Sequence, residues 1–400
     1  MAGKALNAAR MKERNYMRFF SELRVKPMTR AQLARRMDLT RASTSLIADD
    51  LLSTGIIKEG SSDESGRQST KMLSWNDDSF HIAGIFLNRD HITAGITDFC
   101  GNVMDARSFS VIDIENADTA IKLATQYINE MLDRCRPLGK FLGVGVASPG
   151  PLDIPAGIIL DPPSFEKFHN FPIADHLRDV LKCDVVLEND ANSLALAEKC
   201  FGISAEYDRY MELMVDSGIG ASLILDGKLN KGPSGFGNGF GHTSININGP
   251  RCECGNNGCV EMYAAIPRIV EIAVKLDPSL DSWHAIVDRA YLGNPAALEV
   301  LHTEASYLAT LIVNASNVLD IQAVIFAGDY ILYRPEMILE EIEREVNKRI
   351  TSRSERTIAI LPSQLPPKSK VIASANLITE KYLERPFISG NNARYGQTTT

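Results

Sequence analysis

The first 75 residues carry the hydrophobic spacing of helices. One face of a helix expected over residues 6–24 is apolar, with the i, i+3, i+4, i+7 spacing at Tyr16, Phe19, Phe20 and Leu23. Thr29 is placed to cap a short helix, and Thr40 caps the next one, which has Ile47 and Leu51 on its buried side. Two short helices joined by so tight a turn predict a helix-turn-helix.

Residues 56–75 extend this module as a hairpin, because a polar turn over residues 60–66 separates two short strands. Residues 1–76 then form a winged helix-turn-helix, whose third helix enters the DNA major groove with its N-terminal turn. The residues expected at the base edges are Arg41, Ser43, Thr44 and Ser45. Arg67 in the hairpin, with Lys71 behind it, is expected to reach phosphates or the minor groove. A three-helix protein-interaction module with ordinary surface charges is the alternative.

From residue 80 onward, apolar strands alternate with helices. Two buried strands, over residues 142–147 and 185–187, end in the polar loops 148–151 and 188–192. The other elements expected are strands at 81–87, 92–97, 211–215 and 323–328, a helix at 117–134, helices through most of 261–318, and a last helix at 370–383. The alternation predicts an α/β sheet, with ligands bound beyond the carboxyl ends of its strands.

Charge divides the chain into two parts. The net charge is −8 over 400 residues, but residues 1–75 carry a balance of +6 and the remainder a balance of −14. A small basic segment on a large acidic body suggests a nucleic-acid module joined to a part that does not touch phosphates. With 44% hydrophobic and 23% charged residues, the composition excludes a disordered or fibrous chain. No apolar run suits a signal peptide or membrane span, so the cytoplasm is the expected compartment.

Three cysteines lie within eight residues, at Cys252, Cys254 and Cys259, and His242 precedes them. Zinc prefers four nitrogen and sulfur ligands in a tetrahedron, and three thiolates with one imidazole complete that set without an open position. The cluster predicts one structural Zn2+ per chain. A group of free buried cysteines beside a core histidine is the alternative.

With these motifs in place, the chain resembles the ROK family (repressor, open reading frame, kinase). The resemblance rests on His242, the cysteine cluster, Glu261, and the segments 188–192 and 216–220. With the N-terminal module, the whole length is similar to that family's xylose, N-acetylglucosamine and glucose-responsive repressors. The resemblance implies a two-lobed actin-like ATPase fold, a sugar site in the cleft, and a homodimer or homotetramer. The expected lobes are residues 77–197 with a C-terminal helix near 370–385, and residues 198–369 with the zinc site and the oligomerisation surface.

The resemblance also implies roles for single residues. Asp190 matches the general base of the family's kinases, and Asn189 matches a residue that hydrogen-bonds a neighbouring sugar hydroxyl. His242 would bond zinc through one ring nitrogen and a hydroxyl through the other, and Glu261 would accept from a further hydroxyl. The floor of the pocket would be shaped by Gly145, Ser148 and Gly150.

Departures from the family pattern argue against a kinase. The family's kinases open their first hairpin with Asp-x-Gly-Gly-Thr-Lys, whereas residues 86–91 here read Phe-Leu-Asn-Arg-Asp-His. Phosphoryl transfer depends on positioning and charge stabilisation, so losing this loop should remove the activity. The family's usual Glu three residues before the zinc histidine is Gly239, which Asn238 replaces only in part. In the DNA module, Leu46 stands at a commonly basic position.

The sequence therefore predicts a DNA-binding transcriptional repressor of carbohydrate-metabolism genes, with double-stranded operator DNA and a sugar or sugar derivative as partners. Two alternatives stay open: a ROK-type sugar kinase with a fused DNA-binding domain, and a regulator that answers to a protein partner.

Overall fold

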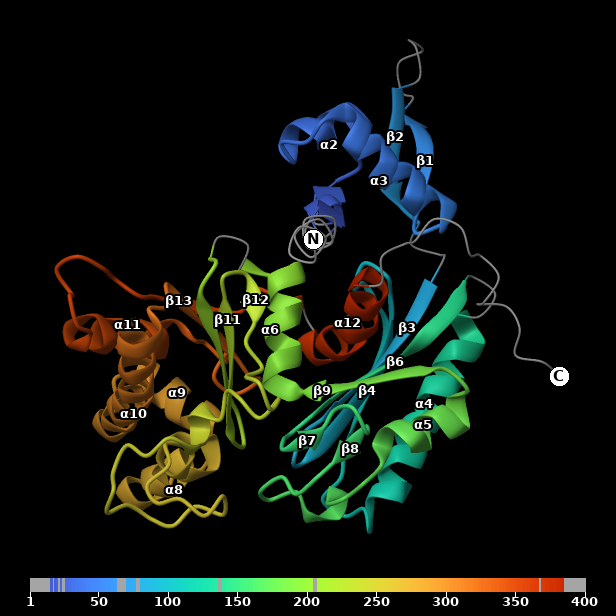
Figure 1. The fold of residues 1–400 in the computed structure, drawn as a ribbon. Helices are drawn as coiled ribbons and strands as arrows, with labels where there is room; N and C mark the ends of the chain where they lie inside the picture. The colour runs from blue at the N-terminus through green and yellow to red at the C-terminus, as the bar shows by residue number, and fades with distance from the viewer. Residues whose placement is uncertain are drawn as a thin grey trace.

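The computed structural model describes residues 15–16, 18–20, 22–23, 26–62, 70–76, 80–135, 139–203, 207–366 and 368–384. Its N-terminal module contains helices α2 (Arg30–Arg36) and α3 (Arg41–Ser53) and a hairpin of strands β1 (Ile57–Ser62) and β2 (Thr70–Trp75). Thr29 forms a capping box with Gln32, and the Thr40 side chain accepts from the Ser43 N–H. The expected helix-turn-helix and hairpin are confirmed, and Figure 1 shows them on top of the molecule.

The described part of the first helix anchors this module to the body. Its expected apolar face is buried at Tyr16, Phe19, Phe20 and Leu23. The Phe20 ring stacks on Trp75 at a centroid distance of 4.9 Å and lies 5.9 Å from Phe99, which belongs to the turn at residues 99–102 of the body. The same apolar cluster continues through Leu142 to Ile378 near the C-terminus. The module and the body therefore share one core, rather than being joined by a linker alone.

The first sheet has the strand order β5-β4-β3-β6-β9, antiparallel from β5 to β3 and parallel from β3 to β9. Helices α4 and α5 cover one face and α12 covers the other. A Cβ atom on Gly145 would lie 1.8 Å from the Ser374 carbonyl oxygen of α12, so glycine permits this close approach. The bounds are β3 (Phe80–Leu87), β4 (His91–Asp98), β5 (Val103–Ser110), α4 (Ala117–Cys135), β6 (Lys140–Ser148), α5 (Ile173–Leu181), β9 (Asp184–Asn189) and α12 (Ser369–Glu384). A small hairpin, β7 (Leu152–Asp153) and β8 (Ile158–Ile159), and the short helix η1 (Glu166–Phe168) follow β6.

The second sheet has the order β12-β11-β10-β13-β14, with β10, β13 and β14 parallel. Its largest apolar core lies under helices α8 to α11, and α6 packs on the opposite side against β10 and β11. The bounds are α6 (Asp190–Phe201), β10 (Tyr210–Val215), β11 (Ile219–Leu225), β12 (Lys228–Leu229), η3 (Phe240–His242), α7 (Glu261–Ala264), α8 (Ile266–Leu276), α9 (Trp283–Tyr291), α10 (Pro295–Leu319), β13 (Ala323–Ala327), α11 (Glu336–Arg349) and β14 (Ala359–Pro362).

Helix α10 is long and apolar enough to cross a bilayer, but 56% of its most apolar window is buried inside the protein. It packs against α8, α9 and α11 and contributes Leu308 and Ile312 to the core. These contacts identify it as a core helix of the second lobe.

Helices α6 and α12 pack against each other between the two sheets (Figure 1). The strands, the long helices and the C-terminal helix expected from the apolar pattern are confirmed, with bounds that differ by a few residues. Because β6 and β9 are parallel neighbours, their carboxyl ends meet, with Ser148 opposite Asn189. The two polar loops expected to bind a ligand therefore lie side by side.

Candidate functional site

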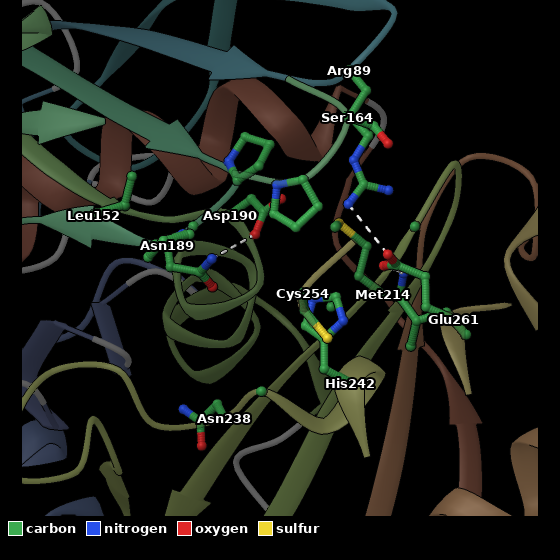
Figure 2. A pocket seen from close by; sticks show the side chains of 18 of the residues that line it. Arg89, Leu152, Ser164, Asn189, Asp190, Met214, Asn238, His242, Cys254 and Glu261 are labelled. Atoms are coloured by element: carbon green, nitrogen blue, oxygen red, sulfur yellow. Dashed lines mark hydrogen bonds and ion pairs between the residues drawn. The ribbon is translucent and has the colours of Figure 1, made fainter. Parts of the chain in front are cut away.

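A cavity of about 690 Å³ opens at this edge of the first sheet, facing the second lobe. One wall is formed by the loop after β6 and by Asn189 and Asp190, and the opposite wall by residues 216–221, 235–239, His242 and Glu261. Figure 2 shows Asp190, His242 and Glu261 around this space. Drug-sized ligands occupy cavities of about 300–1,000 Å³, so the space is large enough for a monosaccharide.

Asp190 is a buried carboxylate of the cavity. It begins α6, and Asn189 caps that helix by accepting from the Asn192 N–H. Asp190 Oδ1 accepts from the Ala191 N–H at 2.8 Å and from Asn189 Nδ2 at 2.9 Å, as drawn in Figure 2. Burial raises the pKa of Asp190 to about 6, although these hydrogen bonds and Arg89 act in the opposite direction. A carboxylate held beside an amide offers an acceptor and a donor to a polyhydroxy ligand.

The metal-binding residues expected from the sequence come together. The ligand atoms of His242, Cys252, Cys254 and Cys259 all lie within 4.8 Å of one another. His242 Nδ1 is 3.6 Å from Cys252 Sγ, and Cys254 Sγ is 3.7 Å from Cys259 Sγ. Burial and the neighbouring cysteines raise the pKa of Cys259 to about 12, so these thiols need a cation to ionise together. Three sulfurs and one imidazole fit Zn2+ in a closed tetrahedral site.

Arg89 is a cavity residue that the sequence analysis missed. It lies in the turn between β3 and β4 and reaches the opposite wall, where its Nη1 donates to the Ser217 carbonyl at 3.2 Å. Its Nη2 is 3.5 Å from Glu261 Oε1, the contact drawn in Figure 2. Glu261 is also held by the Ile219 N–H, which donates to Oε2 at 2.8 Å. The carboxylate expected to bind a hydroxyl is therefore fixed from both walls.

Gly218 makes the Arg89 contact possible. A Cβ atom at this position would lie 2.3 Å from Arg89 Nη1 and 2.8 Å from Glu261 Oε2. Both distances are shorter than a van der Waals contact, so a side chain here would displace the ion pair. The backbone of the turn after β10 is therefore in direct contact with both members of the pair.

Comparisons with known proteins agree with this geometry. Residues 82–381, three quarters of the chain, match the profile described as the ROK family. The chain belongs to the ROK family. It is 27% identical over 370 residues to the xylose repressor of Bacillus subtilis (strain 168), a match that covers 90% of this chain and 94% of the repressor.

Kinases and regulators both occur among the similar proteins. The chain is 30% identical over 252 residues to the glucokinase of Thermotoga maritima, covering 60% of this chain and 79% of the enzyme. A solved ROK family transcriptional regulator, a homolog of the E. coli MLC protein, superposes with a TM-score of 0.76 at 23% identity, covering 94% of this chain and 97% of the regulator. The structural match extends across the N-terminal module and shows the same fold.

Two residues expected to shape the pocket of this ROK protein do not line it. Ser148 is fully buried, its hydroxyl donates to the Pro149 carbonyl at 3.1 Å, and its side chain does not line the cavity. Gly145 lies beneath α12, where the absence of a side chain lets the helix pack closely on the strand. Gly150, Asn189, Asp190, His242 and Glu261 all line the cavity as expected.

The position of the family's usual glutamate is open in this ROK chain. No atom lies within 4 Å of a Cβ built on Gly239. The neighbouring Asn238 donates through Nδ2 to the Asn230 carbonyl at 2.7 Å and to Asn192 Oδ1 at 3.2 Å. Its Oδ1 is buried without a partner among the described residues, and Asn238 lines the cavity. Asn238 therefore lines the cavity with an amide whose nitrogen is held by the protein and whose oxygen is buried.

The candidate DNA-contacting residues occupy the first turn of α3, but not on one face. Arg41 is exposed, and Ser43 and Ser45 are half-buried. Thr44 is fully buried and its hydroxyl donates to the Thr40 carbonyl at 3.1 Å, so the expectation that it reads bases is wrong. Arg67 lies outside the described residues. Leu46 is 71% exposed on this helix.

Proposed function

We propose that this ROK-family chain is a sugar-responsive transcriptional repressor of carbohydrate-metabolism genes, which binds double-stranded operator DNA. The observation that carries the proposal is that two features occur in one molecule. A capped helix-turn-helix shares an apolar core with the body, and the body contains a cleft lined by hydroxyl-binding groups. The alignment to the xylose repressor, which spans 90% of this chain, supports the same assignment.

The ligand side of the proposal uses five residues of the cavity. Asn189 and Asp190 supply a donor and an acceptor from α6, and Glu261 supplies a fixed acceptor from the other wall. Gly150 allows the ligand to approach the loop after β6. His242 faces the cysteines with Nδ1, which leaves Nε2 for a ligand hydroxyl. One structural Zn2+ per chain, bound by His242, Cys252, Cys254 and Cys259, would hold this imidazole in place.

The DNA side of the proposal uses the N-terminal turn of α3. Arg41, Ser43 and Ser45 are the residues proposed to reach base edges, and Arg67 to reach the backbone or minor groove. We propose residues 1–76 as the DNA-binding unit, residues 77–197 with α12 as the first lobe, and residues 198–369 as the second lobe. Two such modules in a homodimer, or pairs of them in a homotetramer, would bind a pseudo-palindromic operator in the cytoplasm.

The first experiment selects the operator from a random DNA library and measures binding by fluorescence anisotropy at a fixed salt concentration. Arg41→Ala should weaken specific binding by about 1–3 kcal/mol. Arg353→Ala, which removes the same charge from the second lobe, is the matched control and should bind like the parent protein. Equal operator affinity in the Arg41 variant and the control would refute the major-groove assignment.

A sugar kinase is the second candidate, and a specific observation favours it. A buried aspartate with a pKa of about 6 is suited to accept a proton from a sugar hydroxyl. Against it, the turn between β3 and β4 lacks the phosphate-binding glycines and places Arg89 on the Ser217 carbonyl. Formation of ADP from ATP in the presence of a bound sugar, lost in Asp190→Ala, would establish the kinase. A regulator without a sugar response would instead retain operator binding with every sugar tested.

A further inference from the structure

The charges that line the cavity define the class of effector it accepts. Six carboxylates and a single Arg or Lys, Arg89, appear among the described lining residues. The carboxylates are Asp161, Glu166, Asp190, Asp216, Glu253 and Glu261. The cavity volume of about 690 Å³ admits a hexose phosphate as readily as a hexose, so charge rather than size decides between them.

The cation of the cavity already has a partner. Arg89 forms the cross-cleft ion pair with Glu261 and donates to the Ser217 carbonyl. The side chains of Arg89 and Glu261 are only 20% and 12% exposed, so water screens this pair weakly. Lys370, a cation beside the cavity residue Asp216, lies 3.5 Å from Asp216 and 2.7 Å from Asp329. Both positive charges are therefore committed to carboxylates of the second lobe.

Four carboxylates of the cavity form no ion pair with a described residue; Asp161, Glu166 and Glu253 are exposed, and Asp190 is buried, where Arg89 partly offsets its charge. No Lys or Arg among the described residues lies within ion-pair distance of Asp161, Glu166, Asp190 or Glu253. A zinc ion in the adjacent cluster would not supply positive charge either, because three thiolates outweigh the two charges of Zn2+. A phosphate or carboxylate placed here would meet unpaired negative charge.

We propose that the effector is an uncharged or amine-bearing sugar and that the cavity rejects its phosphorylated form. Arg89 supplies no cation for a phosphate group, because it is already paired with Glu261, and the unpaired carboxylates of the cavity set the preference. The inference rests on the proposed function, since it assigns the ligand class of the same cleft. The unpaired carboxylates also provide acceptors for ring hydroxyls and for a protonated amine.

Isothermal titration calorimetry of the full-length protein at pH 7.5 tests the proposal with matched pairs. The probes are glucose, glucosamine and N-acetylglucosamine, each beside its 6-phosphate, with xylose as a further neutral sugar. At least one of the unphosphorylated sugars should bind. Where it has a 6-phosphate among the probes, the affinity for the 6-phosphate should be lower by roughly tenfold or more. Raising the ionic strength should narrow the gap within a pair, because salt screens the repulsion.

Three variants separate the causes. Glu166→Gln removes an unpaired charge from an exposed rim position and should raise the affinity for the phosphorylated sugar relative to the free one. Arg89→Met should weaken the free sugar, because Glu261 loses its partner, and should leave the preference for it at least as large. Arg89→Lys, which keeps the charge, should restore part of the affinity.

The outcomes distinguish this inference from the function on which it rests. Tighter binding of a phosphorylated sugar, with that preference lost in Arg89→Met, overturns the inference and leaves the sugar-responsive repressor intact. Binding of no sugar of either kind, by protein that still binds its selected operator, refutes the sensing function and the inference together.

Discussion

Replacing Asp190 by asparagine is expected to stabilise the ligand-free protein at neutral pH while abolishing its response to the effector. Asp190 is 7% exposed, and burial raises its pKa to about 6 from an ordinary value of 3.8. Between these two pH values the folded state holds a proton that the unfolded state has released. The parent protein therefore loses stability as pH rises through this range, and the loss persists above pH 6.

The size of the effect follows from the two pKa values. The difference corresponds to about 3 kcal/mol at pH 7.5 and to about half of that at pH 5. Asparagine avoids the free-energy cost of a buried ionised carboxylate because it stays neutral, and its amide oxygen can still accept from the Ala191 N–H. The variant should therefore be more stable than the parent by up to about 3 kcal/mol at pH 7.5.

Urea unfolding at pH 5 and pH 7.5 measures the effect directly. Comparison with the parent protein cancels every other titrating group, so the pH dependence of the difference belongs to Asp190. Asp281→Asn, at an exposed position of the second lobe, is the matched control and should change neither stability nor its pH dependence. Two results would refute the reasoning. The Asp190→Asn variant could be less stable than the parent at pH 7.5, or the difference in unfolding free energy between variant and parent could be the same at both pH values.

The remaining predictions concern the metal, the cleft and the DNA module. Mass spectrometry under native conditions should find one zinc per chain, and Cys259→Ser should lose it, because a cluster with one thiolate removed no longer completes the tetrahedron. Gly218→Ala should weaken effector binding by displacing Arg89 and Glu261, whereas Gly239→Ala, with open space around its Cβ, should bind like the parent; calorimetry of both variants decides. Thr40→Ala should destabilise α3 by about 1 kcal/mol and reduce protection of its amides in hydrogen exchange, because the Ser43 N–H loses its acceptor.

Local rules explain why much of this structure could be predicted. Thr29 and Thr40 were recognisable as caps because each precedes an apolar-periodic run, and a capping hydrogen bond involves only residues three positions apart. The metal cluster was visible because three of its ligands are close in sequence. The polar loops after β6 and β9 were expected together because parallel strands end at one edge.

Two wrong expectations had a signal in the sequence. Thr44 precedes Ile47 by three residues and Leu51 by seven, so helical periodicity already places it on the buried face of α3. The base-reading interpretation considered position in the helix and ignored this face. Gly145 was assigned to the pocket from the family resemblance, although a glycine inside a buried strand more often marks a close backbone approach, here that of α12.

Arg89 could not have been found from spacing. Its partners Ser217 and Glu261 lie 128 and 172 residues away, so the contact depends on how the two lobes face each other. The sequence showed only that the glycines of the kinase loop are absent. The structure adds what stands at this turn instead, a guanidinium that crosses the cleft to Ser217 and Glu261.

The position of α6 and α12 gives this cleft a physical route to the DNA module. Asp190 begins α6, and α6 packs against α12 between the two sheets. Ala375 and Ile378 of α12 are buried in the same apolar cluster as Phe20, Trp75 and Phe99. A ligand that moved Asp190 would therefore act through α6 on α12, the helix that packs against the N-terminal module. Such coupling is reciprocal. If operator DNA and the effector favour different arrangements of these helices, each must lower the binding affinity of the other by the same factor.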